Sequence, residues 1–310
     1  MWQYYIMIIV AVLGFSVQFV FTKLYQKQRG ASFLSATLMT FINSAFFVPA
    51  YFALNSFKLE ITWFSVLIAC LYGLNGIICN VFGMKVLSFV SLSIYSMFLM
   101  LGGMLVPFVY GLIFLGEKIT LFKALAVILT IFALAFTLKK DGKEKQKITP
   151  FAIFCFVMLF LTNGFCGVLV YIHQRASVEI VSSSGFLLLC SMARLILAGG
   201  IALGIKLVND RKRDKSLLPT EVSATDKNLI CKGWLISICA VAGYSVVHGL
   251  AQLLSTITAS FIDAGVQSTI TTGGCIFMSA LFGLIFKEKI TKNTVFTLIL
   301  ALAGVILMMF

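Results

Sequence analysis

One arginine, Arg194, stands in the apolar segment CSMARLILAGG, residues 190–200. A charged side chain at the centre of a membrane helix costs about 2.5–3.5 kcal/mol on insertion scales, so this guanidinium must face protein or water. Two interpretations stay open. The guanidinium binds a carboxylate or another anion of a substrate, or it ties its own helix to neighbouring carbonyl groups. Arg194 is therefore the first candidate substrate-binding residue.

A second polar set lies between residues 248 and 267. His248 and Gln252 are four residues apart and share one helix face, and a His titrates near neutral pH. Asp263 precedes Gln267 by four residues near the start of an apolar run, where free N–H groups also favour an Asp as a cap. We predict His248, Gln252 and Gln267 as substrate-binding residues, and Asp263 and His248 as proton or ion coupling residues. A packed, hydrogen-bonded His and a capping Asp are the alternatives.

Uncharged polar side chains are spread over the other apolar runs. Each is either a substrate contact or an interhelical hydrogen bond worth about 0.6–2 kcal/mol. Together they predict a mostly uncharged cavity, in which Phe, Met and Tyr supply contact area for an apolar part of a substrate. The candidates are Asn43, Asn75, Tyr95 and Asn163 for substrate binding, with Gln18, Asn80 and Ser96 as further members of the polar set.

Catalytic and metal-binding patterns are missing from the sequence. No embedded His/Glu pair, Ser/His/Asp set or Gly-rich phosphate loop with its Lys occurs, so we expect neither an enzyme nor a cofactor. The eight Cys residues lie in or beside apolar runs without a CxxC pair, which is typical of small apolar packing residues. We therefore expect no metal site.

The segments that must carry these polar residues are long and apolar. The chain is 60% hydrophobic and 11% charged, with Phe at 30 of its 310 positions, which is too apolar for a soluble domain. Continuous apolarity without alternation selects helices over a barrel, so we predict an all-α integral membrane protein. The ten predicted transmembrane helices are roughly 2–22, 32–54, 61–83, 87–115, 118–138, 149–172, 183–208, 229–253, 257–286 and 290–310.

The net charge of +13 has a topological explanation. If the ten spans alternate in direction, 19 of the 24 Lys and Arg residues fall in the loops on one side, and four fall on the other. The positive-inside rule produces such a bias, so the basic residues orient the chain and imply no nucleic-acid partner. The rule places loops 139–148 and 209–228 in the cytoplasm and both termini outside.

Two short sequences recur at a separation of 171 residues. Gly102-Gly103 matches Gly273-Gly274, and the tetrapeptide Glu-Lys-Ile-Thr at 117–120 returns at 288–291. The copies divide the ten spans into two blocks of five, and because five is odd the second block is inverted in the membrane. We predict repeats at 1–138 and 149–310, joined by a cytoplasmic linker at 139–148.

The matched tetrapeptides have a structural use. Thr120 and Thr291 can cap the helix that follows, and Glu117 and Glu288 can pair with nearby Lys at the water boundary. We therefore leave these four residues out of the predicted substrate contacts.

The segment KVLSFVSLSIYSMFLMLGGMLVPFVYGLIFLGEKIT, residues 85–120, combines a basic residue at a break, a small polar stretch, Pro107 and a terminal Gly-Glu-Lys-x-Thr. It resembles the EamA-type transporters of the drug/metabolite transporter superfamily, and FIDAGVQSTITTGGCIFMSALFGLIFKEKIT, residues 261–291, repeats the pattern without the Pro. The resemblance covers nearly the whole chain and implies ten helices in two repeats. Family members often carry Arg early in the second and seventh helices. Arg194 fits the seventh, whereas Phe41 occupies the other place.

The resemblance and the polar residues together predict a secondary-active transporter of a small metabolite, either amino acid-like or amphipathic, in a cytoplasmic membrane. It would work by alternating access between the two inverted repeats, as a monomer or homodimer whose partners are lipid and substrate. Characterised relatives usually keep both termini in the cytoplasm, opposite to the orientation that the charges predict here. The alternative function is a non-transporting membrane receptor or scaffold that uses the basic loop 209–228. A lipid-processing enzyme has no catalytic set to support it.

Overall fold

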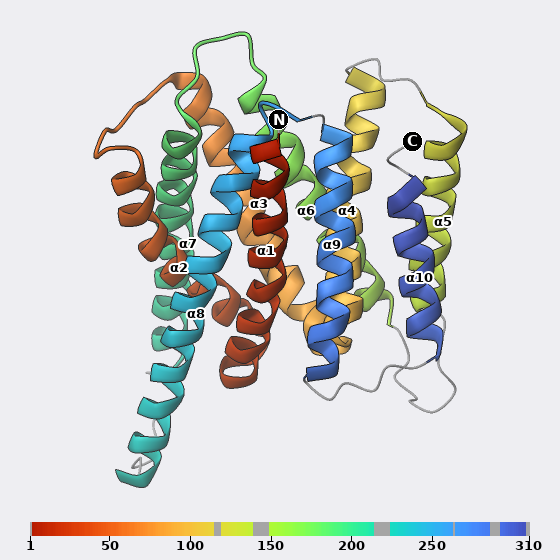
Figure 1. Cartoon of the computed structure of the whole chain (residues 1–310). Coiled ribbons are helices and arrows are strands. Elements are labelled where there is room, and N and C mark those ends of the chain that lie inside the picture. Colours follow the sequence, from red (N-terminus) through yellow and green to blue (C-terminus); the bar gives the residue numbers. More distant parts are fainter. Residues whose placement is uncertain are drawn as a thin grey trace.

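The computed structural model describes residues 2–114, 119–138, 149–213, 224–262, 264–285 and 292–307. Ten α-helices account for nearly all of these residues, and they run up and down past one another (Figure 1). The helices are α1 (Trp2–Arg29), α2 (Phe33–Leu54), α3 (Trp63–Phe89), α4 (Leu92–Phe114), α5 (Leu121–Leu138), α6 (Pro150–Gln174), α7 (Ser183–Arg213), α8 (Ala224–Thr258), α9 (Ala264–Ile285) and α10 (Lys292–Leu307). The predicted all-α fold is confirmed.

Local sequence explains where several helices begin and end. α2, α3 and α6 each follow a Ser or Thr whose hydroxyl accepts a hydrogen bond from a backbone N–H three residues on, namely Ser32, Thr62 and Thr149. Pro150 suits the first turn of α6, where an N–H would have no helical partner. α1 is followed by Gly30, whose φ of 72° lies in the left-handed region that favours glycine.

Within the described residues, seven helices are long and apolar enough to cross a membrane, namely α1, α2, α3, α4, α6, α7 and α8. α5 and α10 contribute shorter apolar helices, Leu121–Ala133 and Val295–Leu307. The first turns of α9 carry Gln267, Ser268 and Thr269, which lowers the hydropathy of that helix. The structure is therefore that of a multi-pass helical membrane protein, and the length and composition criteria identify seven of the ten predicted spans.

The long helices have one exposed apolar face and one face packed against other helices. On α7, Ile196 is 70% exposed, and on α8, Val246 is 72% exposed. Polar residues two positions away point to the other side, because a step of two residues turns a helix by about 200°. Arg194 on α7 and both Tyr244 and His248 on α8 therefore face the interior of the bundle, where they line a cavity.

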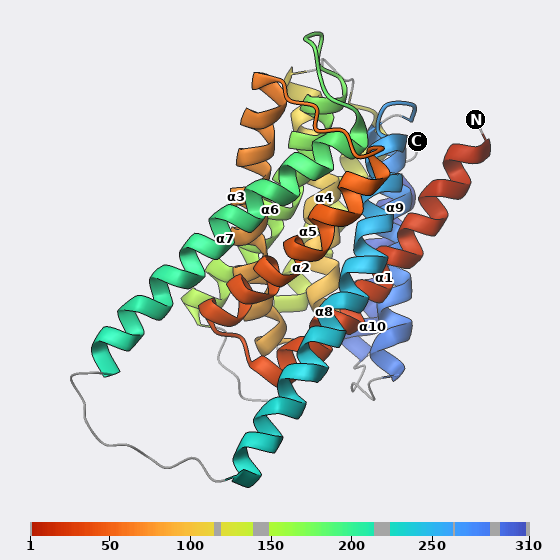
Figure 2. The same cartoon turned by 90° about the vertical axis from the view of Figure 1, so that its left-hand side faces the viewer.

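The predicted loop 209–228 is shorter than expected. α7 continues to Arg213 and α8 already begins at Ala224, so residues 209–213 and 224–228 are helical and the sequence-based boundaries are wrong. α8 has 35 residues, roughly 52 Å at 1.5 Å per residue, against a hydrocarbon core of about 30 Å. The start of α8 projects beyond the other helices in Figure 1, and Figure 2 shows that the end of α7 also reaches out of the bundle. Lys and Arg have high helix propensity, which suits the continuation of these helices past the apolar run.

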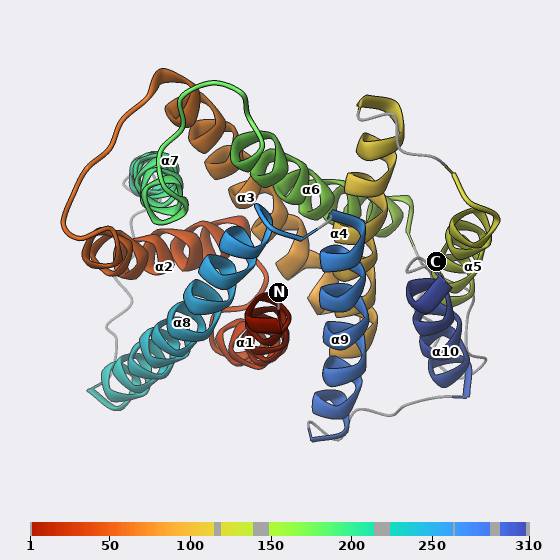
Figure 3. The same ribbon diagram turned by 45° about the horizontal axis from the view of Figure 1, so that its top comes forward.

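The helices pack in pairs that are distant in sequence. α1 lies against α8 and α9, α6 lies against α3 and α4, and α2 packs on α7. α5 and α10 form a pair at one side of the bundle (Figure 3). The two described ends of the chain, the start of α1 and the end of α10, lie at the same end of the bundle, opposite the projecting ends of α7 and α8 (Figure 1).

Candidate functional site

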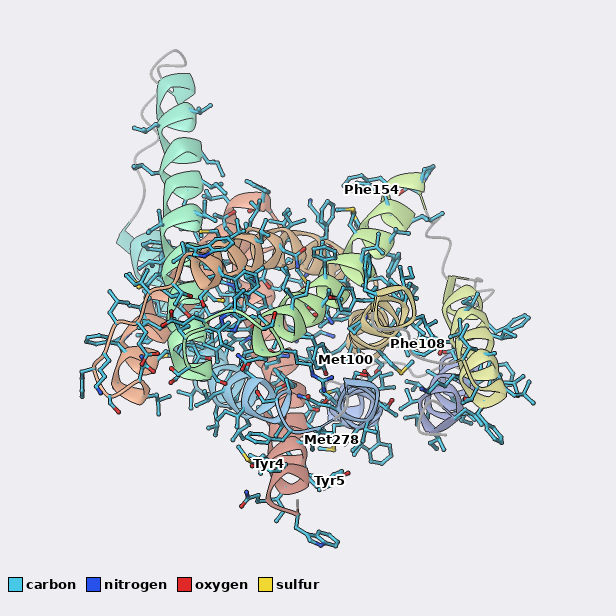
Figure 4. All side chains as sticks on the ribbon, turned by 90° about the horizontal axis from the view of Figure 1, so that it is seen from above. Tyr4, Tyr5, Met100, Phe108, Phe154 and Met278 are labelled. Atoms are coloured by element: carbon cyan, nitrogen blue, oxygen red, sulfur yellow. The ribbon has the colours of Figure 1, made fainter. Side chains whose placement is uncertain are left out.

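A cavity of about 200 Å³ lies inside the bundle. Its described lining residues come from α1, α2, α3, α4, α6, α7, α8 and α9, with none from α5 or α10. Figure 4 looks down the bundle from above and shows Met100, one of the lining residues, near the middle, while Tyr5 and Phe154 lie at the outside. The cavity therefore lies between helices of both halves of the chain.

Arg194 lines this cavity from α7. Its guanidinium carbon lies 4.7 Å from the centre of the Tyr72 ring, a cation–π distance. Gly76 leaves room for it, since a Cβ at that position would lie 2.8 Å from Nη2 of Arg194. Within the described part of the chain, no acidic side chain or carbonyl group pairs with this guanidinium, and its buried Nε has no hydrogen-bond partner. The described residues therefore show no contact of the kind expected if Arg194 tied its helix to neighbouring carbonyl groups.

His248 lines the same cavity from α8, within an aromatic cluster. Its ring lies 5.0 Å from that of Tyr244 and 5.8 Å from that of Phe47, measured between ring centres. Its buried Nδ1 has no hydrogen-bond partner in the described ranges. The ring is thus packed as the alternative interpretation expects, but one of its nitrogen atoms is left unpaired.

Gln267 and Gln252 also lie in the cavity wall. Gln267 donates from Nε2 to the Ser255 carbonyl at 2.7 Å and to the Thr258 hydroxyl at 3.0 Å, and its Oε1 accepts from the Tyr171 hydroxyl at 3.3 Å. Its amide thereby links α6, α8 and α9. Gln267 is therefore held by the protein itself, which leaves its amide little capacity for a ligand.

Asn163 on α6 and Tyr95 on α4 both line the cavity. Asn163 donates from Nδ2 to the Leu99 carbonyl at 2.7 Å, which joins these two helices. The Tyr95 ring packs edge-on against Phe19 with centres 5.9 Å apart. Both side chains thus combine a packing role with a position on the cavity.

Two predicted site residues are not among the residues that line the cavity. Asn43 accepts a 2.7 Å hydrogen bond from Ser245 and clamps α2 to α8. Asn75 donates to the Thr162 carbonyl at 2.7 Å and to Sγ of Cys166 at 3.0 Å, clamping α3 to α6. These contacts are the interhelical hydrogen bonds that were the alternative for each residue.

Of the remaining predicted residues, the structure describes Thr120. Thr120 caps α5, since its hydroxyl accepts a hydrogen bond from the Lys123 N–H at 3.2 Å. The other four predicted residues of this group, Glu117, Asp263, Glu288 and Thr291, lie outside the described residues, as does the predicted linker 139–148.

Tyr72 and Tyr244 are cavity residues that the sequence-based selection missed. Tyr244 precedes His248 by four residues, and Tyr72 precedes Gly76 by the same interval, so each pair shares a helix face. The spacing from His248 could have identified Tyr244. Tyr72 had no such signal, because Gly76 has no side chain to mark the face.

The fold and the central cavity define a multi-pass helical membrane protein with a polar site between its helices. A solved structure, described only as a crystal structure of a protein, is similar to this chain with a TM-score of 0.60 and 16% sequence identity. The match covers 98% of this chain and 96% of the other, and at this identity it shows a shared fold alone. No family model matches the sequence. No curated protein matches it either.

Proposed function

We propose that this protein is a secondary-active carrier of a small metabolite, with the architecture of the EamA-type transporters that the sequence resembles. The observation that supports it best is Arg194, a cation that no described acidic side chain pairs with, on a cavity between helices of both halves. Polar groups at membrane depth are costly and are retained where they bind substrates or ions. A site between two halves of a chain suits alternating access, in which the halves rock about a bound solute.

The packing pattern supports an inverted repeat within this proposal. Adding five to a helix number in the first block gives its counterpart in the second. The contacts of α1 with α8 and α9 then correspond to those of α6 with α3 and α4, and both sets are present. The pairs α2 with α7, α4 with α9 and α5 with α10 correspond to themselves. Gly102-Gly103 and Gly273-Gly274 occupy equivalent places in α4 and α9.

The receptor or scaffold alternative has one feature in its favour. The ends of α7 and α8 project beyond the other helices, and the sequence around them is basic (Figure 2). A docking surface there would not need a cavity inside the membrane, nor an unpaired guanidinium within it. We therefore rank this function second.

Reconstitution in liposomes tests the carrier proposal. Purified protein should accumulate or release some members of a broad panel of radiolabelled metabolites, driven by an imposed gradient or by exchange with internal unlabelled solute. Protein-free liposomes provide the control. If no solute in the panel moves, the carrier proposal is wrong.

The orientation proposed from the charge bias is both termini outside and the projecting ends of α7 and α8 in the cytoplasm. A C-terminal fluorescent protein that matures only in the cytoplasm should then stay dark, whereas a C-terminal alkaline phosphatase should be active. A reporter placed at residue 218, between α7 and α8, is the matched control and should give the reverse pattern. Fluorescence at the C-terminus would reverse the proposed orientation.

A further inference from the structure

Three residues that line one cavity each carry a buried polar atom without a described partner. These atoms are Oε1 of Gln18 on α1, Nε of Arg194 on α7 and Nδ1 of His248 on α8, and no described group hydrogen-bonds to any of them. Buried polar groups in folded proteins are nearly always hydrogen-bonded, and each unpaired one calls for an explanation. Three such residues, from three helices, line one cavity, and this points to a ligand that completes their hydrogen bonds.

The chemistry of these atoms restricts the ligand. A guanidinium only donates hydrogen bonds and carries a permanent positive charge, so it prefers a carboxylate or a similar anion. The amide oxygen of Gln18 only accepts, so it requires an N–H or O–H group. Gln18 is only 6% exposed, which leaves little access for bulk water. A ligand that pairs with both the Arg194 guanidinium and the Gln18 amide oxygen therefore has an anionic end and a donor group.

Aromatic side chains form part of the remaining wall. Phe15 and Phe19 flank Gln18 along α1, and Tyr72 and Tyr244 line the cavity beside Arg194 and His248. Aromatic faces bind flat apolar groups with favourable contact beyond simple area burial. The cavity volume of about 200 Å³ limits the ligand to a small metabolite.

We propose that the cavity binds a small organic carboxylate that also carries an N–H or O–H donor and a ring. Arg194 binds the carboxylate, Gln18 accepts from the donor, and the aromatic side chains hold the ring. This rests on the carrier function proposed above and names its substrate class. Organic cations that lack an anionic group are excluded, because Arg194 repels them and no described acidic side chain lines the cavity.

Four related probes test the proposal by their binding to the purified full-length protein, measured by isothermal titration. L-Phenylalanine and 3-phenyllactate carry a carboxylate and a donor, 3-phenylpropionate carries only the carboxylate, and 2-phenylethylamine carries only a cation. The first two should bind about tenfold more tightly than 3-phenylpropionate, as expected for one hydrogen bond to a buried acceptor. 2-Phenylethylamine should not bind.

Gln18→Leu isolates the donor contact. It should remove the tenfold preference for 3-phenyllactate over 3-phenylpropionate and leave 3-phenylpropionate binding unchanged, which also reports that the variant is folded. Gln18→Met, with a side chain of similar length, serves if the Leu variant does not fold. Thr269→Val is the matched control, because Thr269 also has a buried unpaired hydroxyl but is not a cavity-lining residue. It should keep the preference.

Three results would overturn the substrate class: no binding of any probe, binding of 2-phenylethylamine as tight as that of 3-phenyllactate, or an unchanged preference in Gln18→Leu. Failure of the carrier function looks different. Probes that bind in the predicted order but do not cross liposomes would support this site and contradict transport. Transport of an organic cation would support the carrier and contradict this substrate class.

Discussion

Gly102→Leu should prevent the protein from reaching its folded state. A Cβ on Gly102 would collide with the carbonyl oxygen of Phe160, a backbone atom of α6. The reciprocal position is equally tight, since a Cβ on Gly164 would meet the side chain of Val106 and the carbonyl oxygen of Gly102. Extra atoms in a packed core cost about 1–3 kcal/mol when side chains can adjust. Here backbone faces backbone, so α4 and α6 would have to separate.

The chain contains a matched control for this substitution. Gly200 is also within a predicted membrane helix, but a Cβ there would meet nothing within 4 Å. Gly200→Leu should therefore purify like the unmodified protein. Size-exclusion chromatography in detergent and thermal unfolding compare the two variants. The close approach of α4 to α6 would be contradicted if Gly102→Leu remained monodisperse with an unchanged melting temperature.

Arg194→Gln should abolish transport while the protein stays folded. The substitution removes the positive charge that lines the cavity and keeps a polar side chain of moderate length. Losing one partner of a buried charge pair costs about 2–5 kcal/mol, because the substrate anion would remain buried without its cation. Folding should survive, since no described carbonyl or carboxylate depends on this guanidinium. Arg194→Lys should transport weakly, because an ammonium group keeps the charge but loses the planar, two-pronged hydrogen bonding.

Arg175→Gln is the matched control for Arg194→Gln. Arg175 donates from Nη2 to the Ile262 carbonyl at 3.1 Å and is not among the residues that line the cavity. Uptake into liposomes, compared at equal amounts of reconstituted protein, should be normal for Arg175→Gln and absent for Arg194→Gln. Uptake by Arg194→Gln at the unmodified rate would contradict the role of Arg194 in substrate binding.

The positions of the helices could be predicted because hydropathy depends on sequence alone. Each long apolar run between polar breaks forms a helix, and Thr149 and Thr120 cap the helices that follow them. The prediction was wrong where hydropathy stops being informative, at the ends of α7 and α8. There the sequence becomes charged while the backbone remains helical in the described residues up to Arg213 and from Ala224.

The members of the cavity wall were harder to predict. Asn75 and Asn80 are both amides on α3. Asn75 hydrogen-bonds to α6 and does not line the cavity, whereas Asn80 lines the cavity and donates to Thr40 on α2. Five residues turn a helix by about 500°, so these two side chains point in different directions. The amide of Asn43 looked equally suitable for substrate, but it accepts a hydrogen bond from Ser245.

The sequence by itself determined the membrane class of this protein, the approximate helix positions, the charge bias between its two sides and the short list of polar residues at membrane depth. Only the tertiary structure decided which of these residues share a cavity. The physical reason is that lipid and protein interior are both apolar, so the hydrophobic pattern of a membrane helix does not reveal its rotation. Packing against neighbouring helices sets that rotation, and it brings Gln18, Arg194 and His248 to one cavity.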